Sequence, residues 1–337
     1  MKVLALTTGL NVPSARFRVR QYSDYLLSKG VLVDEYYSKF SAYPPEKDRE
    51  IWAIKSLMDR IPAIINTYKA DVTWIQKPFI STYHTFEGLT KNPRVFDVDD
   101  AIFLRKNGIF AQKIAKKSQV VFCGNEYLAN YFENYNSNIY IIPTAVDSNR
   151  FKKIVVNDKV NDEEIVIGWS GTSGGYKYVE TLEKAFLVLF EKYNNIKLRI
   201  TSDKKPKFHP KIMEKIDFEY WSKENEVNEI NKIDIGIMPL NNDEFTLGKC
   251  SYKMLLYMAC EKPVVVSDIG MNSKVLSQGQ IGYGCNKIDE WIECLSDLIE
   301  NEKKRKEFGI SGRKVVVENY SINGVGNNIY EAFRRIK

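Results

Sequence analysis

Two lysines near the start of a predicted helix are the strongest candidates for binding an anion. Lys249 and Lys253 lie in the segment Gly248-Lys249-Cys250-Ser251-Tyr252-Lys253, between predicted strands at 235–238 and 264–267. Their spacing of four residues predicts that both side chains lie on one face of the helix. A cation at a helix N-terminus opposes the helix dipole, and a bound anion removes the conflict. The segment therefore predicts a diphosphate site with Lys249 and Lys253 as catalytic cations; two solvated surface lysines are the alternative.

Three carboxylates, Asp97, Asp99 and Asp100, follow one another closely at the carboxyl end of a predicted strand over 95–98. Their mutual repulsion predicts a raised pKa for at least one of them, as in many functional sites. We expect Asp99 and Asp100 to be catalytic, either in acid–base chemistry or by orienting a hydroxyl group. A helix cap or turn is one alternative. A Mg²⁺ site at Asp97-Val98-Asp99 is the other, because hard cations prefer carboxylate oxygens.

Residues in loops after other predicted strands are candidates for holding phosphates or a nucleotide. A glycine-rich turn at 168–175, followed by Lys177, would let the backbone approach a phosphate closely. Arg16 and Arg20 share a predicted helical face and suit a phosphate clamp, with ordinary surface charge as the alternative. The complete set of predicted ligand-binding residues is Gly9, Arg16, Arg18, Gly171, Thr172, Lys177, Ser202, Glu244, Gly248, Lys249 and Lys253.

The composition indicates a globular protein whose reactive groups are carboxylates, lysines and arginines. The chain has 337 residues, enough for two medium domains, with a net charge of +6 and two histidines. Its five cysteines are scattered without a CxxC pair, so neither a zinc site nor a disulfide framework is predicted. The N-terminal apolar run, Val3–Leu6, is short and no stretch approaches about 18 apolar residues, so we expect neither a signal peptide nor a membrane-spanning helix. We expect a cytoplasmic protein that requires no metal cofactor and binds no nucleic acid.

Short apolar runs alternate with helical patterns in two series, which is typical of parallel sheets covered by helices. The runs are Val3–Thr7, Val72–Ile75, Val95–Val98, Val120–Cys123, Tyr140–Ile142, Ile165–Trp169, Lys197–Thr201, Ile235–Met238 and Val264–Ser267. A charged stretch, Asn149–Glu164, lies between the two series and has the composition of a linker.

These elements predict an α/β protein with two doubly wound domains. We expect an N-terminal acceptor-binding domain over 1–155 and a C-terminal nucleotide-binding domain over 156–322. Residues 323–337 contain a predicted helix, capped by Ser321, that returns to the first domain. Neither series contains a GxGxxG pattern, which disfavours a dinucleotide-dependent dehydrogenase.

Taken in order, these segments resemble the large family 4 of retaining glycosyltransferases, which have the GT-B fold. The resemblance covers nearly the whole chain and rests on Gly9, Asn125-Glu126-Tyr127-Leu128, Ile142-Pro143-Thr144-Ala145-Val146-Asp147 with Phe151, and Met258-Ala259 with Pro263-Val264-Val265. Asp97-Val98-Asp99-Asp100-Ala101 together with the Gly248 to Ala259 segment is similar to the bacterial branch that makes surface polysaccharides. The resemblance implies two facing Rossmann-like domains, with the nucleotide bound mainly in the C-terminal one.

The chain departs from the family pattern at several functional positions. The family's glutamate pair falls on Gly248 and Leu256, and its arginine after the first strand of the second domain falls on Trp169. Its histidine in the first domain is best matched by Asp99. Lys249 and Lys253 are therefore expected to carry more of the phosphate binding, and Glu244 or Asp243 to contact the sugar.

The resemblance implies transfer of a sugar, with retention of configuration, from a UDP- or GDP-sugar to a hydroxyl of a lipid-linked glycan. A sugar-nucleotide epimerase and a catalytically degenerate sugar-nucleotide-binding subunit are the alternatives. The basic stretch Leu104–Lys117 is interpreted as an amphipathic helix for peripheral membrane contact, with an ordinary surface helix as its alternative.

Overall fold

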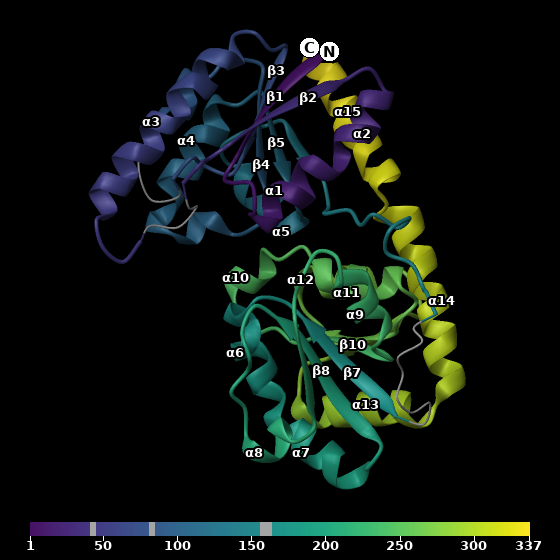
Figure 1. The fold of residues 1–337 in the computed structure, drawn as a ribbon. Helices are drawn as coiled ribbons and strands as arrows, with labels where there is room; N and C mark the ends of the chain where they lie inside the picture. Colours follow the sequence, from purple (N-terminus) through teal and green to yellow (C-terminus); the bar gives the residue numbers. More distant parts are fainter. Residues whose placement is uncertain (41–44, 81–84, 156–163) are drawn as a thin grey trace. The chain divides into compact units, whose positions relative to one another are not determined.

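The computed structural model describes residues 1–40, 45–80, 85–155 and 164–337, which form two compact units (Figure 1). Unit 1 consists of Met1–Ala145, Leu247–Cys250 and Ile322–Lys337, and unit 2 of Val146–Thr246 and Ser251–Ser321. The change of unit after Ala145 precedes the boundary expected at residue 155, because Val146 and Phe151 pack in the core of unit 2. Part of the expected linker, residues 156–163, lies outside the described residues.

Unit 1 is built on a parallel six-stranded sheet with the order β2-β1-β3-β4-β5-β6. Its strands are β1 (Lys2–Thr7), β2 (Leu32–Tyr37), β3 (Val72–Gln76), β4 (Arg94–Val98), β5 (Val120–Cys123) and β6 (Ile139–Ile141). The central strands β3 and β4 are buried along their whole length, as their continuous apolar runs predict. The strand order reverses between β1 and β3, and ligands of open parallel sheets bind beyond the carboxyl ends of strands at such a switch point.

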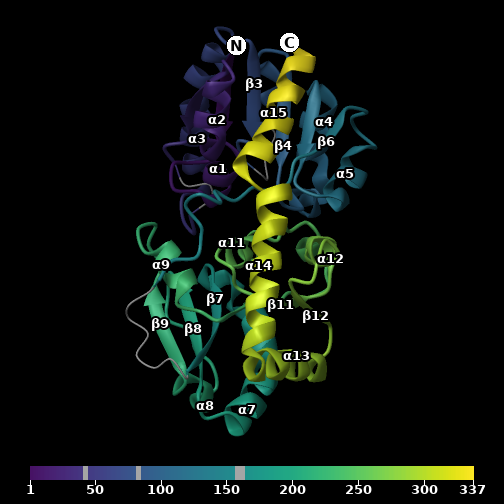
Figure 2. The same cartoon turned by 90° about the vertical axis from the view of Figure 1, so that its right-hand side faces the viewer.

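Helices cover both faces of this sheet and form two core layers. One layer contains α2 (Ser23–Ser28), which follows α1 (Pro13–Arg18) in the chain, and the C-terminal α15 (Ile322–Ile336). The other contains α3 (Arg49–Thr67), α4 (Ile109–Lys117) and α5 (Glu126–Phe132). Figure 2 shows α15 lying along unit 1. Its Phe333 ring packs edge-on against Trp74 of β3, with 5.4 Å between ring centroids. The C-terminal helix is therefore part of the core of unit 1.

Unit 2 contains a second parallel sheet, with the order β12-β11-β10-β7-β8-β9. Its strands are β7 (Ile165–Ser170), β8 (Ile196–Ser202), β9 (Ile216–Tyr220), β10 (Ile235–Met238), β11 (Val264–Ser267) and β12 (Gly282–Cys285). Its helices are α6 (Tyr176–Val179), α7 (Glu183–Lys192), α8 (Pro210–Met213), α9 (Glu226–Asn231), α10 (Glu244–Leu247), α11 (Tyr252–Ala259), α12 (Gly270–Leu276), α13 (Ile288–Glu300) and α14 (Glu302–Asn319). The switch point of this sheet lies between β7 and β10.

The three strands that the apolar runs did not indicate are β2, β9 and β12, and each lies at an edge of its sheet. Their side chains are mostly half-buried or exposed, so they lack the continuous apolar run of a central strand. The lack of an apolar run therefore explains why these strands escaped prediction, whereas the remaining edge strand, β6, was indicated by the run Tyr140–Ile142.

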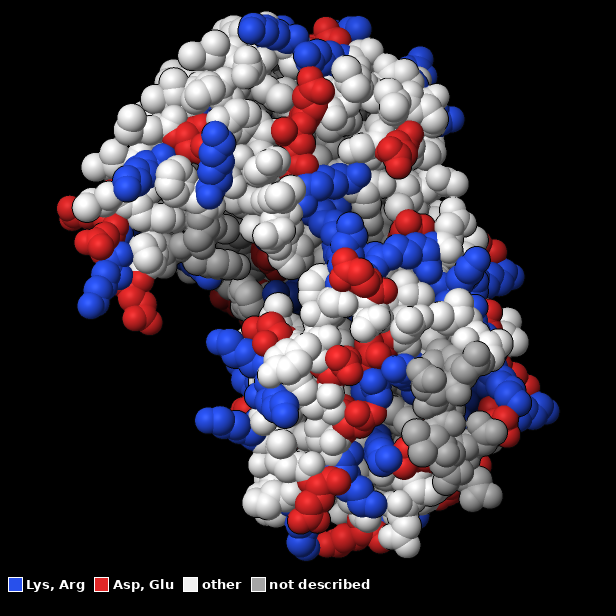
Figure 3. All heavy atoms as spheres, viewed as in Figure 1, with Lys and Arg blue, Asp and Glu red and all other residues white. Residues whose placement is uncertain are grey.

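The visible face of each unit carries basic and acidic side chains interspersed with uncharged ones (Figure 3). In the described part of the chain, no helix combines the length and the apolar character needed to span a bilayer.

Candidate functional site

Four charged side chains of unit 1 meet beyond the carboxyl ends of β3 and β4. The Lys77 ammonium lies 2.7 Å from an Asp99 carboxylate oxygen and 2.7 Å from one of Asp100. Lys249 lies 3.2 Å from the other Asp100 oxygen. Burial alone would raise the pKa of Asp100, but Lys77 and Lys249 outweigh it and lower the pKa to about 2. Asp100 is thus ionised at neutral pH and suited to accept hydrogen bonds rather than to act as a general acid.

Lys77 is the member of this cluster that the sequence reasoning missed. It directly follows β3 and has a left-handed backbone with φ of 63°. Its backbone N–H donates to the Asp97 carbonyl at 3.0 Å, which fixes the residue beside β4. Burial would lower the pKa of the Lys77 ammonium, but Asp99 and Asp100 outweigh burial and raise it. The only available signal was a charged residue immediately after a buried strand.

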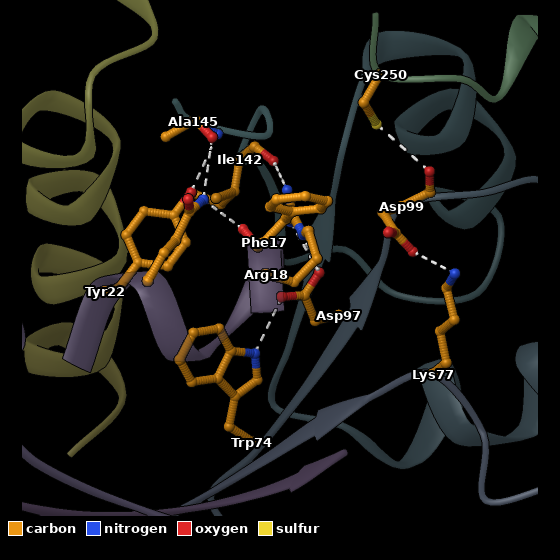
Figure 4. Close-up of polar contacts among 11 residues, drawn as sticks. Phe17, Arg18, Tyr22, Trp74, Lys77, Asp97, Asp99, Ile142, Ala145 and Cys250 are labelled. Atoms are coloured by element: carbon orange, nitrogen blue, oxygen red, sulfur yellow. Dashed lines mark hydrogen bonds and ion pairs between the residues drawn. The ribbon is translucent and has the colours of Figure 1, made fainter. Parts of the chain in front are cut away.

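Asp97 points away from this cluster, into the core of unit 1 (Figure 4). The Arg18 guanidinium donates to one Asp97 oxygen from Nε at 2.9 Å and from Nη2 at 2.7 Å, and Trp74 Nε1 donates to the other at 3.1 Å. Both charged side chains are essentially inaccessible to solvent. The pKa of Asp97 is raised, as predicted for one of the three carboxylates, but burial is the main cause. Asp97 and Asp99 therefore serve different partners and do not act as a pair.

The location of Arg18 corrects its prediction as a phosphate ligand. Its remaining terminal nitrogen donates to the Ile142 carbonyl at 2.6 Å, so the whole guanidinium is engaged inside the protein. Arg20 is engaged as well, with Glu35 at 2.5 Å and the Gly9 carbonyl at 2.8 Å. Arg16 is half-buried, with its guanidinium 4.3 Å above the Phe17 ring. Arg20 thus stabilises the conformation of the Gly9 loop by hydrogen bonding to its backbone.

The short segment Leu247–Cys250 is seated on unit 1 by several contacts. The Asn125 amide donates to the carbonyls of Leu247 and Lys249, at 3.0 Å each. A Cβ at Gly248 would lie 2.7 Å from the backbone nitrogen of Ala101, so only glycine fits there. The buried Cys250 thiol donates to the Asp99 carbonyl at 3.4 Å. Gly248 is therefore a packing position, where the close approach of Ala101 leaves no room for a longer side chain.

The predicted shared helical face of Lys249 and Lys253 is wrong. Helix α11 begins at Tyr252, and Ser251 before it has a left-handed backbone with φ of 53°. Lys249 consequently lies outside the helix and belongs to unit 1, whereas Lys253 lies in the first turn of α11 in unit 2.

Lys253 is positioned at the carboxyl end of β7 in unit 2. Its ammonium lies 5.6 Å from the ring centroid of Trp169, and a Cβ at Gly171 would meet its Cε at 2.5 Å. The Ser251 hydroxyl does not cap α11; it donates to the Asn272 side chain at 2.6 Å. The Tyr257 hydroxyl on α11 accepts from the Ser170 backbone at 2.8 Å. A lysine, a glycine turn and a helix N-terminus thus come together beside the switch point of this sheet.

The other residues predicted in unit 2 differ in their burial and in their contacts with this turn. The Asp203 carboxylate accepts from the Ser173 backbone N–H at 2.6 Å and from the Ser202 hydroxyl at 3.2 Å. Ser202 is buried and supports the turn through Asp203. Thr172, Lys177 and Glu244 are exposed. Leu256 is buried in the core of unit 2. Within unit 2, the structure brings the predicted residues Gly171 and Lys253 into contact.

The predicted amphipathic helix over Leu104–Lys117 is not continuous. Two short 3-10 helices, η3 (Ile102–Leu104) and η4 (Lys106–Gly108), precede α4. Ile114, expected on a membrane-facing side, instead packs in the core of unit 1. Lys113, Lys116 and Lys117 are exposed, so α4 alone has the pattern of an ordinary surface helix.

The sequence and fold were compared with known proteins. Residues 164–301, which belong to unit 2 except for Leu247–Cys250, match the family model described as "Glycosyl transferases group 1". A segment of 87 residues is 26% identical to the alpha-maltose-1-phosphate synthase of Mycolicibacterium smegmatis, covering 23% of this chain and 22% of that protein. The chain thus matches less than a quarter of that relative's length.

Solved structures match over almost the entire chain. Anabaena Alr3699/HepE, in complex with UDP and glucose, has a TM-score of 0.71 and 12% identity, with 99% of this chain and 100% of that chain covered. WaaG, a glycosyltransferase involved in lipopolysaccharide biosynthesis, has a TM-score of 0.69 and 12% identity, with 99% of each chain covered. At this identity the likeness concerns the fold, and it confirms the predicted GT-B architecture.

Proposed function

We propose, from the premise that this chain is a GT-B glycosyltransferase of the group 1 type, that it transfers a sugar from a nucleoside diphosphate to a hydroxyl group of a glycan. We assign the donor to unit 2 and the acceptor to unit 1.

The contact between Lys253 and the Gly171 turn is the observation that carries this proposal. The turn follows the first strand of the sheet at its switch point, where ligands of doubly wound sheets bind. The first turn of α11 offers backbone N–H groups and the positive end of its dipole, and Lys253 adds a full charge. These positive charges and backbone N–H groups together suit the diphosphate group of a sugar donor.

The chemistry that follows from these residues is electrostatic. As the bond between the sugar and the diphosphate breaks, negative charge grows on the leaving oxygen, and Lys253 and the α11 N-terminus stabilise it. A leaving phosphate oxygen accepts the proton of the attacking hydroxyl, which delivers the sugar from the same face and retains its configuration. Because protein cations supply this stabilisation, we propose that transfer needs no metal ion. Full activity in EDTA is expected.

The carboxylates of unit 1 suit the acceptor. Asp99 and Asp100 are held by Lys77, and the pKa of about 2 keeps Asp100 a hydrogen-bond acceptor at working pH. We propose that they orient the acceptor hydroxyl, and that Lys249 fixes Asp100 for this task.

The finer identity of the substrates rests on the sequence resemblance. We propose a UDP- or GDP-sugar donor and a lipid-linked acceptor in surface polysaccharide biosynthesis, on the cytoplasmic side of a membrane. The exposed Lys113, Lys116 and Lys117 of α4 support contact with anionic lipid. Flotation with anionic vesicles at low salt tests this contact, and no binding would refute it.

The proposed function is tested by a melting-temperature screen across UDP-, GDP- and CMP-sugars, followed by product analysis with the stabilising donor. A bound donor is expected to raise the melting temperature. Transfer to a glycan acceptor, with the anomeric configuration of the donor preserved, is the expected result. Donor conversion without an acceptor would indicate an epimerase. Binding without turnover would indicate a binding subunit, which the absence of both family glutamates at Gly248 and Leu256 makes the second candidate.

A further inference from the structure

Helix α3 carries a row of large apolar side chains on its outward face. Each side chain in this row is 47% to 63% exposed, and we call the row the α3 stripe: Ile51, Ile54, Met58, Ile61, Ile65 and Tyr68. In the view of Figure 3, the atoms over α3 are mainly uncharged. Contiguous exposed apolar surface of this kind marks an interaction site more often than a solvated helix.

The inward face of α3 holds the helix on unit 1 without help from the stripe. Its buried residues include the small side chains Ala53, Ser56 and Ala63. The buried Arg60 guanidinium donates to the Thr7 carbonyl at 2.7 Å and lies 4.9 Å from the Phe79 ring centroid. The helix therefore buries Ile64 together with mostly small or polar side chains, while most of its large aliphatic side chains face outward, unlike those of a surface helix that faces only water.

The spacing of the stripe is that of a helix–helix seam. Successive members are separated by three, four, three, four and three residues, which is the heptad pattern of two packed helices. At 1.5 Å per residue the stripe extends over about 25 Å. A row this narrow fits a second helix better than the broad apolar face of a helix lying in a membrane.

The stripe is also symmetric about its midpoint, between Asp59 and Arg60. A two-fold axis at that point would bring Ile51 opposite Tyr68, Ile54 opposite Ile65, and Met58 opposite Ile61 of a second α3 running in the opposite direction. Every apolar side chain would then meet another apolar one. An interface between identical chains around a two-fold axis requires this self-complementarity.

The charges around the stripe are mixed. Membrane-binding helices are rich in lysine and arginine on their polar face. The exposed charged residues along α3 and in the turn before it have both signs: Glu46, Lys47, Asp48, Arg49, Glu50, Lys55 and Lys69. Such a surface has little net attraction for an anionic bilayer.

We propose that the α3 stripe is the interface of a homodimer, with α3 packed antiparallel against α3 of a second copy of this chain. The apolar surface continues beyond the end of α3, because the Tyr68 hydroxyl donates to the Leu89 carbonyl at 3.1 Å, and Leu89 and Phe86 are exposed. This continuation enlarges the contact toward the area that a stable dimer needs. The inference is independent of the proposed function.

Sedimentation velocity over about 1 to 100 µM protein tests the dimer. We expect a dimer for the unaltered chain and a monomer for Met58→Lys, with at least a tenfold rise in the dissociation constant. Ile310→Lys, at an exposed apolar position in unit 2, is the matched control and should leave the dimer intact. Ile54→Glu provides a second stripe variant, and circular dichroism verifies that each variant is folded. A monomer at every concentration, or a dimer unaffected by both stripe variants, overturns the proposal.

Cysteine cross-linking tests the antiparallel arrangement. Ile51→Cys and Tyr68→Cys chains, mixed and oxidised, should form a mixed disulfide dimer, whereas neither variant alone should cross-link through its new thiol. Disulfides within each single variant would indicate parallel helices. Monomeric chains whose flotation with anionic vesicles is lost in Ile54→Glu would assign the stripe to a membrane and contradict the dimer.

Discussion

Two groups of ion pairs lie near the carboxyl end of strand β4. Both pair aspartates with basic side chains, but they differ in how far solvent reaches them. Asp97 and Arg18 form a pair that solvent does not reach, with every polar atom of the guanidinium engaged. Two and three residues later, Asp99 and Asp100 bind Lys77 and Lys249, with side chains 13% to 31% exposed. The first group is closed, and the second can exchange partners with a ligand.

The difference teaches which carboxylates are available for chemistry. Alternation along a strand sends Asp97 to one face of the sheet, where removal from water must be matched by a complete set of donors. Asp99 and Asp100 lie beyond the strand, where Lys77 contacts both carboxylates and Lys249 contacts Asp100, and part of their surface stays open. Substitutions in the two groups should therefore separate stability from activity.

The largest effect on stability is expected for Arg18→Met. The substitution leaves Asp97 buried without its cation, which should lower the free energy of unfolding by about 3–5 kcal/mol. Urea unfolding followed by circular dichroism measures the change. Lys249→Met is the matched control from the open group, and a loss of at most about 1 kcal/mol is expected there. Similar losses for both variants would refute the distinction between closed and open groups.

An intermediate effect is expected for Lys77→Met. Two neighbouring carboxylates would lose their shared cation, so transfer should fall at least tenfold and the unfolding free energy by about 1–3 kcal/mol. Adding Asp100→Asn removes the repulsion and should restore part of the stability without restoring transfer. If the double variant is no more stable than Lys77→Met alone, the proposed pairing is incorrect.

Much of this contrast could not be predicted from the sequence. The apolar runs located the central strands, and the carboxylate cluster after β4 was visible as a pattern. The partners were not, because Arg18 is 79 residues from Asp97, and Lys77 meets Asp99 only because β3 and β4 are neighbours. The separation of Lys249 from Lys253 depends on the left-handed backbone of Ser251. Serine rarely adopts this conformation, so the residue type gave no indication of it.

An effect of similar size is expected from the pH dependence of Asp100. Its folded pKa of about 2 lies below the ordinary value of 3.8, so its ion pairs stabilise the fold above about pH 4, and the gain is lost as the pH falls through 2. The contribution at neutral pH amounts to about 2 kcal/mol. Unfolding of the unaltered chain and of Asp100→Asn should therefore differ most above pH 5 and converge toward pH 2. A gap that widens on acidification would contradict the lowered pKa.

The claim that unit 2 holds the donor diphosphate through Lys253 is tested most directly by calorimetric titration of UDP and GDP into the unaltered chain and into Lys253→Ala. Removing a charged hydrogen-bond donor should weaken binding of the preferred nucleotide by about 1.5–3 kcal/mol, or roughly 10- to 150-fold. Lys184→Ala, which alters an exposed lysine on α7, should bind as the unaltered chain does. Unchanged affinity in Lys253→Ala, with the fold intact, would contradict the account.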